Sequence, residues 1–312
     1  GRGRGRDSVR RHRGHQAKRR PVTRVLEPEL AVRLAGLTLR ARRTVDGLLS
    51  GMPRSPHRGA SAIFKEHRAY RPGDEPRLID WRAYARSDRY TIKHFEHETQ
   101  LRGTLALDIS KSMRWGSADV TKLDYAATLL AALAYVLTRQ ADAVSLVTFD
   151  ERIQDRVPAR SGPAHLDYLM RHLAEPGPAR SKTSLHASLD GLIEHAGRMG
   201  LVVIASDLLD LSDDALEPIA RIQARGHQTV LLHIMDPAEL DFPFEQPTRF
   251  EGAEGEPFVE ADPKGIQREY REAIDEFLET CQRRVVAAGA TYMLARTDLP
   301  PERVLIQLLR GR

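Results

Sequence analysis

The apolar positions of this chain fall into short uninterrupted runs that alternate with longer segments of helical spacing. The runs beyond residue 102 predict strands over 103–108, 143–149, 200–207, 228–235 and 291–296. The segments between and after them predict helices over 123–140, 164–173, 184–199, 214–226 and 265–289. Strands that are buried on both faces read as continuous apolar runs. This alternation therefore predicts an α/β fold with a mostly parallel central sheet and helices on both faces.

The segment before this alternation has a different character. Apolar residues over 27–49 recur at helical spacing, and a polar stretch follows them. Within that stretch "RYTIKHFE" (Arg89 to Glu96) alternates enough to predict a strand. We therefore interpret residues 25–100 as an N-terminal helical and extended arm, and residues 101–312 as the α/β domain.

Charge changes the interpretation of the first 24 residues. The chain has 312 residues and a formal net charge of +5, and its start, "GRGRGRDSVRRHRGHQAKRRPVTR", is strongly basic with almost no apolar residues. Such a segment cannot bury enough surface to offset its ordering entropy, so residues 1–24 are predicted to form a disordered basic tail. A tail of this kind can contact nucleic acid, an anionic membrane surface or an acidic protein. A tail that only adds solubility is an equally simple interpretation.

Cysteine content and hydropathy bear on the compartment. The single cysteine, Cys281, rules out an internal disulfide framework and a zinc site built from cysteines. The longest apolar segment, Tyr125 to Leu137, is shorter than the roughly 20 residues that a membrane-spanning helix needs. No apolar signal segment follows the basic start. We therefore expect a cytoplasmic protein.

Carboxylate and hydroxyl side chains stand where two predicted strands end. Asp108 ends the first strand and is followed by Ser110 and Ser112. Asp207 ends the third strand, and Thr183 comes just before a predicted helix. Because the carboxyl ends of parallel strands meet at one edge of a sheet, we expect these oxygens to converge. Oxygen donors suit Mg²⁺, or Mn²⁺ or Ca²⁺ in its place. Helix capping by the same hydroxyls is the simpler alternative.

These residues also carry a resemblance to a known family. The sequence D-I-S-K-S at 108–112, Thr183 and the Asp of "IASD" at 207 resemble the metal-ion-dependent adhesion site of von Willebrand factor A domains. Longer stretches, among them "YRPGDEPRLIDWRAYARSDRYTIKHFEHET", "KLDYAATLLAALAY" and "AGATYMLARTD", are similar to a bacterial von Willebrand factor A-like family, domain of unknown function 58. The resemblance runs from about Gly51 to the C-terminus and implies a Rossmann-like von Willebrand factor A domain.

The resemblance also implies roles for the candidate residues. Ser110, Ser112 and Thr183 would bind the metal through their hydroxyls, and Asp108 and Asp207 would act directly or through water. The chain departs from the common family pattern at residues 180–182, where Arg-Ser-Lys precedes Thr183 in place of glycines. These cations, together with Lys111, could weaken metal binding or could replace part of the metal's charge.

The implied function is that of a binding protein. The resemblance implies an association with MoxR-type AAA+ ATPases, in systems that assemble or activate other proteins. We therefore expect a non-enzymatic adaptor whose bound cation keeps an open position. An acidic side chain of a protein partner, such as a MoxR-type ATPase or its client, would occupy that position.

Several enzyme classes lack their key residues here. A phosphoaspartate phosphatase would carry a second carboxylate two residues after the first, where this chain has Ser110. The chain has no G-x-S-x-G elbow of a serine hydrolase and no G-x-x-x-x-G-K-[ST] phosphate loop. Two alternatives to the adaptor stay open. One is a metal-dependent hydrolase of unknown substrate, and the other is a nucleic-acid or membrane-surface protein that acts through the basic tail.

Overall fold

The structure is a computed structural model that describes residues 28–51, 63–69, 84, 91–96, 102–179, 184–194, 196, 199–212, 214–250, 252 and 258–310. The predicted basic tail, residues 1–24, lies outside the described residues, and so does Thr183. The predictions made for them therefore stay predictions.

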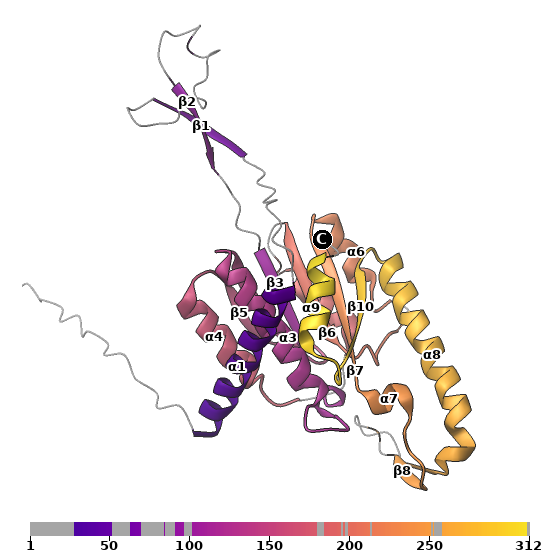
Figure 1. The fold of residues 1–312 in the computed structure, drawn as a ribbon. Helices are drawn as coiled ribbons and strands as arrows, with labels where there is room; N and C mark the ends of the chain where they lie inside the picture. The colour runs from indigo at the N-terminus through magenta and orange to yellow at the C-terminus, as the bar shows by residue number, and fades with distance from the viewer. Residues whose placement is uncertain are drawn as a thin grey trace, which may run out of the picture.

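A six-stranded sheet forms the centre of the molecule (Figure 1). Its strands are β3 (Arg102–Asp108), β4 (Ala143–Phe149), β5 (Ile153–Arg160), β6 (Gly200–Ser206), β7 (Gln228–Met235) and β10 (Thr291–Arg296). Their spatial order is β10-β7-β6-β3-β4-β5. Every neighbouring pair is parallel except β4 and β5, which are antiparallel. The mostly parallel α/β sheet predicted from the apolar runs is confirmed.

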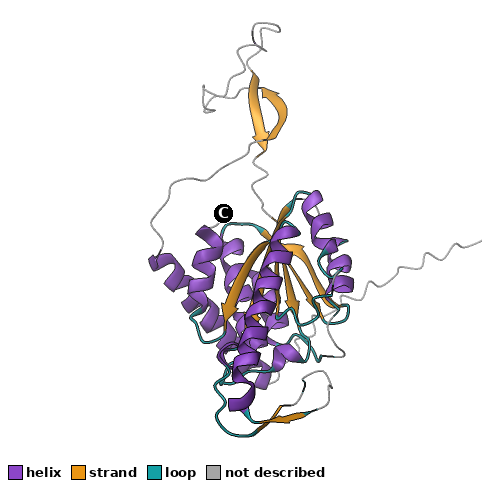
Figure 2. Cartoon of the chain, turned by 90° about the vertical axis from the view of Figure 1, so that its right-hand side faces the viewer, coloured by secondary structure: helices purple, strands orange, loops and turns teal. Residues whose placement is uncertain are grey.

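Helices cover both faces of the sheet (Figures 1 and 2). The helices on one face are α1 (Pro28–Gly51), α3 (Lys122–Arg139), α4 (Pro163–Ala174) and α9 (Pro301–Arg310). Those on the other face are α5 (Leu185–Ile193), α6 (Glu217–Ala224) and α8 (Pro263–Ala287). Leu105 and Leu107 of β3 belong to the first core, and Ala106 belongs to the second. Successive residues of the strand thus point to opposite faces of the sheet. Because helices cover both faces, every one of these residues is buried and the strand is apolar throughout.

The remaining elements are short. They are the antiparallel strands β1 (Ile63–Ala69) and β2 (Thr91–Glu96), the 3₁₀ turn η2 (Ser112–Arg114), the helix α7 (Pro237–Asp241), and the antiparallel strands β8 (Thr248–Phe250) and β9 (Val259–Ala261). None of the described helices has the length and apolar character that crossing a membrane requires.

The helix α3 packs against the central sheet, and its first turn lies next to the candidate site. Thr121 caps its start, because the Thr121 hydroxyl accepts a hydrogen bond from the Asp124 backbone N–H at 3.1 Å. Leu129, Leu130 and Leu133 are buried against the sheet. The cap fixes where the helix begins, and this places Lys122, the first helical residue, at the carboxyl ends of the strands.

The structure differs from the prediction most clearly at the end of one helix and at one strand of the central sheet. The helix predicted over 184–199 is α5, which ends at Ile193. The strand β5 was not predicted. Along it only Val157 is buried, and it lies at the edge of the sheet, so it shows neither an apolar run nor a regular alternation.

Candidate cation site

Three of the predicted site residues lie together at the carboxyl end of β3. The Asp108 side chain is fully buried; its Oδ1 accepts a hydrogen bond from the Ser110 backbone N–H at 2.9 Å, and its Oδ2 accepts one from the Ser206 hydroxyl at 2.7 Å. The hydroxyl oxygens of Ser110 and Ser112 are 3.0 Å apart, and both residues are buried. The turn after β3 therefore gathers one carboxylate and two hydroxyls in a small volume.

Asp207 lies at the end of the neighbouring strand. It directly follows β6, which is parallel to β3 and pairs with it up to Leu107 and Ala205. The two strands are parallel neighbours, so their carboxyl ends lie at one edge of the sheet, as the predicted parallel sheet requires. Burial and, next, the charge of Asp207 raise the pKa of the Asp108 carboxyl to about 7, although hydrogen bonds from Ser206 and Ser110 oppose the shift. The two carboxylates are thus close enough to repel each other.

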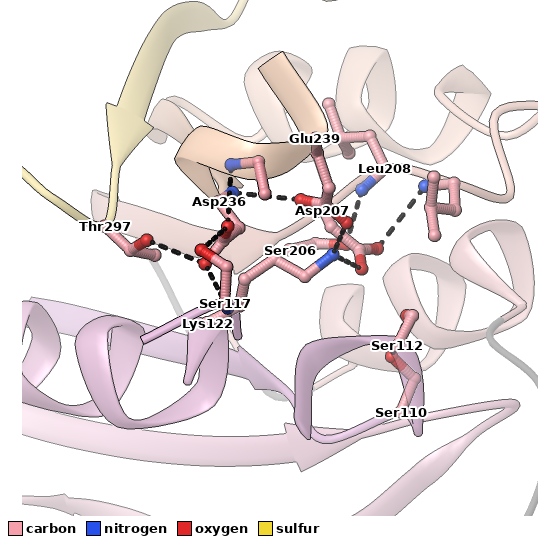
Figure 3. Close-up of polar contacts among 12 residues, drawn as sticks. Ser110, Ser112, Ser117, Lys122, Ser206, Asp207, Leu208, Asp236, Glu239 and Thr297 are labelled. Atoms are coloured by element: carbon pink, nitrogen blue, oxygen red, sulfur yellow. Dashed lines mark hydrogen bonds and ion pairs between the residues drawn. The ribbon is translucent and has the colours of Figure 1, made fainter. Parts of the chain in front are cut away.

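A buried lysine, which the sequence analysis did not assign to the site, contacts Asp207. The Lys122 ammonium donates to Asp207 Oδ2 at 2.9 Å and to Glu239 Oε1 at 2.6 Å (Figure 3). The Lys122 and Asp207 side chains are each only 1% exposed. Burial alone would lower the pKa of Lys122, but the charges of Asp207 and Glu239 outweigh it, so this pKa is raised and the ammonium is charged at neutral pH.

Glu239 is in turn held by α7. Burial raises the pKa of its carboxyl, and the charge of Lys122 opposes that rise. Glu239 Oε2 accepts a hydrogen bond from the Asp236 backbone N–H at 2.9 Å, and Asp236 Oδ1 accepts one from the Ala238 N–H at 2.8 Å. This reciprocal pair is a capping box. The spacing D-P-A-E at 236–239 is the sequence signature of a capping box, so the contact between Asp236 and Glu239 could have been predicted from the sequence.

Asp236 also fixes the loop that precedes α3. Its carboxylate accepts hydrogen bonds from the Ser117 backbone N–H at 2.9 Å and from the Ser117 hydroxyl at 2.5 Å. A Cβ on Gly116 would lie 2.6 Å from the Val120 carbonyl oxygen, so only glycine permits this close turn. The loop between Ser112 and α3 is therefore tied to the carboxyl end of β7.

His233 supports the backbone of Asp207. The ring is buried, and burial is the main cause that lowers its pKa to about 4, so it is neutral at neutral pH. Nε2 lies 2.9 Å from the Asp207 carbonyl oxygen, and Nδ1 lies 2.8 Å from the Tyr292 hydroxyl. A neutral ring can satisfy both contacts when Nε2–H donates to the carbonyl and Nδ1 accepts from the hydroxyl.

The donor chemistry of this site fits a hard cation. Serine hydroxyls and carboxylate oxygens are ligands that Mg²⁺ prefers. Asp207 Oδ2 accepts a hydrogen bond from Lys122, whereas Oδ1, among the residues that the structure describes, has a 3.4 Å contact with the Leu209 backbone N–H. No group of three or more His, Cys, Asp or Glu side chains in the described part of the chain is placed to hold a metal ion. A cation here would therefore depend on the hydroxyls of Ser110 and Ser112.

Comparison with known sequences gives a family but no activity. A family model described as "Protein of unknown function DUF58" matches residues 66–285, which is more than half of the chain. The uncharacterized protein Mb1516 of Mycobacterium bovis and the uncharacterized protein Rv1480 of Mycobacterium tuberculosis are each 27% identical to it over 276 residues. That alignment covers 87% of this chain and 86% of each relative.

Comparison with solved structures finds weaker likeness. The conserved hypothetical protein BatB from Bacteroides thetaiotaomicron matches with a TM-score of 0.45 and 16% identity, over 68% of this chain and 98% of that chain. An aerotolerance-related membrane protein from Bacteroides fragilis matches with a TM-score of 0.45 and 16% identity, over 67% of this chain and 99% of that chain.

Proposed function

Since this chain belongs to the DUF58 family of proteins of unknown function, we propose that it is a non-enzymatic adaptor that binds a partner protein through a divalent cation. The cation, Mg²⁺ or in its place Mn²⁺ or Ca²⁺, would be held at the carboxyl ends of β3 and β6. The residues that would hold it are Asp108, Ser110, Ser112, Thr183 and Asp207. A carboxylate of the partner would complete the cation's set of oxygen ligands.

The observation that carries this proposal is the convergence of oxygens at one edge of the sheet. The Ser110 and Ser112 hydroxyls are 3.0 Å apart, and the Asp108 carboxylate that precedes them accepts a hydrogen bond from the Ser110 N–H. These groups are buried, so their oxygens are already desolvated and ordered before any ligand arrives. A pre-ordered set of this kind lowers the entropic cost of binding a cation.

The arrangement is consistent with a von Willebrand factor A-like domain that has a metal-ion-dependent adhesion site. Support comes from the D-I-S-K-S sequence after β3 and the aspartate directly after the parallel neighbour β6. Within this proposal the partner is a MoxR-type AAA+ ATPase or a client of one, and the adaptor takes part in assembling or activating other proteins. Thr183, the remaining proposed ligand, lies outside the described residues.

The contacts of three ionisable groups near the site, Asp207, Glu239 and His233, support an adaptor over a hydrolase. A hydrolase needs a general base that can reach a metal-bound water. Asp207 and Glu239 both hold the Lys122 ammonium, and the neutral His233 is buried behind Asp207 with both ring nitrogens in hydrogen-bond contact. Each of these three groups is held by an ion pair or by hydrogen bonds within the protein and is therefore not free to act as a general base. This supports binding as the function.

The proposal predicts cation-dependent capture of a protein from the native host. Immobilised wild-type chain is expected to retain at least one host protein in Mg²⁺ and to release it in EDTA, because the partner's carboxylate needs the cation as its ligand. The Ser112→Ala variant removes one hydroxyl oxygen and is expected to retain less of that protein. Quantitative mass spectrometry of the retained proteins measures this.

A matched control is Ser212→Ala, which removes a serine hydroxyl from the exposed Ser212–Asp214 contact instead. It is expected to capture as much as the wild type. Capture that is the same in Mg²⁺ and in EDTA, or no capture in Mg²⁺, would contradict the proposed function.

A further inference from the structure

The two edge strands of the central sheet differ in how well they are protected. The sheet ends at β5 on one side and at β10 on the other (Figure 1). An edge strand presents backbone N–H and C=O groups that can pair with a further strand, and proteins usually block such an edge with proline, charged side chains or bulges. An edge that lacks these devices is therefore a candidate interaction surface.

The β5 edge carries all three devices. Pro158 lies within the strand and offers no N–H. Asp155, Arg156 and Arg160 are exposed and charged. The pairing of β5 with β4 is also irregular, because its register shifts at two places. The β5 edge is thus closed to a further strand.

The β10 edge lacks these devices over residues 291–295. Its sequence, T-Y-M-L-A-R, has no proline, and it pairs with β7 in one unbroken register from Thr291 to Arg296. Its charged residue, Arg296, stands at the end of the strand, where Asp241 and Asp298 hold the guanidinium group. Among the residues that the structure describes, no strand lies on the other side of β10. This edge of the sheet is therefore open.

The ladder with β7 shows which backbone groups of β10 point outward. The Thr297 N–H donates to the Met235 carbonyl oxygen at 3.0 Å, so it points toward β7. Because successive residues alternate along a strand, residues 291, 293 and 295 also face β7, and the N–H and C=O of Tyr292 and Leu294 point outward. Within the described part of the chain, no hydrogen bond engages these outward groups. Leu294 is 37% exposed, so the edge is accessible.

The sequence of β10 suits pairing with a second copy of the same strand. In an antiparallel pair centred on Met293, Tyr292 of one copy lies opposite Leu294 of the other, and each outward N–H meets an outward C=O. Thr291 then lies opposite Ala295, so no charged side chain faces one of the same sign. Apolar side chains, those of Met293 and Leu294, come together near the centre of the pair.

We propose that the chain forms a homodimer in which β10 pairs antiparallel with β10 of a second copy and joins the two central sheets into one. Two identical antiparallel strands are related by a two-fold axis, so the contact closes after two copies and does not propagate. The pairing needs no cation and uses no residue of the cation site, so it stands independently of the function proposed above.

The test is analytical ultracentrifugation of the folded wild-type chain in EDTA, from about 1 µM to about 1 mM, with amide hydrogen exchange at the same concentrations. The wild type is expected to pass from monomer to dimer, and the amides of Tyr292 and Leu294 should exchange more slowly as the dimer forms. Leu294→Pro removes an outward N–H and no bond to β7, a position at which edge strands accept proline. Because the bond is lost in both copies, the dissociation constant should rise about tenfold or more.

Two further variants locate the contact. Leu294→Lys keeps the N–H but adds a like charge to both copies near the centre of the pair, so it should also weaken the dimer. The matched control, Leu39→Lys, adds the same charge on α1, where Leu39 is 51% exposed, and should dimerise as the wild type does. Circular dichroism confirms that each variant is folded. The proposal is overturned by a wild type that stays monomeric over the whole range, by a dimer that neither Leu294 variant weakens, or by an equal weakening in Leu39→Lys.

Discussion

Replacing Lys122 with methionine is expected to lower the free energy of unfolding by about 3–5 kcal/mol, the range for breaking a buried ion pair by removing one partner. Methionine has a similar length and keeps the packing, but it removes the ammonium that contacts Asp207 at 2.9 Å and Glu239 at 2.6 Å. The Asp207 side chain is 1% exposed, so water cannot replace the lost contact without opening the structure. Two carboxylates would then face each other without a counter-charge.

Urea unfolding at neutral pH, followed by circular dichroism, measures this loss. The matched control is Lys111→Met, which removes an exposed lysine from the turn after β3. Its effect should stay within about 0.5 kcal/mol, as is usual for surface substitutions. A loss below about 1 kcal/mol in Lys122→Met would show that the ion pair contributes no more than a surface one, contrary to its burial.

Replacing Asp108 with asparagine is expected to weaken Mg²⁺ binding by about 10- to 100-fold, as the loss of groups that support a metal's ligands does in other sites. The amide keeps the shape of the side chain and can still accept the hydrogen bond from the Ser110 N–H. It removes one negative charge from the cation's surroundings. Calorimetric titration of Mg²⁺ into the folded chains, with Mn²⁺ as a second cation, measures the effect.

Asp155→Asn is the matched control for this titration. It removes an exposed carboxylate from the edge strand β5, so Mg²⁺ affinity should be that of the wild type. Ser112→Ala removes one hydroxyl and should lose affinity without changing the charge. Wild-type and Asp108→Asn titrations that coincide would show that the oxygens at the end of β3 do not hold the cation.

The sequence predicted the central sheet because its strands are buried on both faces. Such a strand appears in the sequence as a continuous apolar run, which can be recognised without knowing its neighbouring strands. An example is β3, with Leu105, Ala106 and Leu107. The sequence also placed Asp108 and Asp207 at the carboxyl ends of two strands, because each apolar run stops at a carboxylate, and the structure shows that these strands are neighbours. The edge strand β5 was missed because a single buried residue, Val157, leaves no pattern.

The ion pair of Lys122 was missed for a different reason. Asp207 lies 85 residues after it and Glu239 lies 117 residues after it, so the fold alone brings the three together. Lysine is also among the residues least often fully buried, so a lysine at the start of a helix is normally interpreted as exposed to solvent. No local pattern distinguishes it. Glu239 did have a local signature, the capping box with Asp236, but that signature predicts a helix start and says nothing about Lys122.

The most direct test of the central claim, that a cation joins this chain to its partner, is one calorimetric measurement on the protein captured in Mg²⁺. That protein is titrated into the wild type and into Asp108→Asn, each in Mg²⁺ and in EDTA. The account predicts tight binding only for the wild type in Mg²⁺, and weaker binding in the other three conditions. Equal affinity in all four conditions would contradict it and would leave an ordinary protein–protein surface.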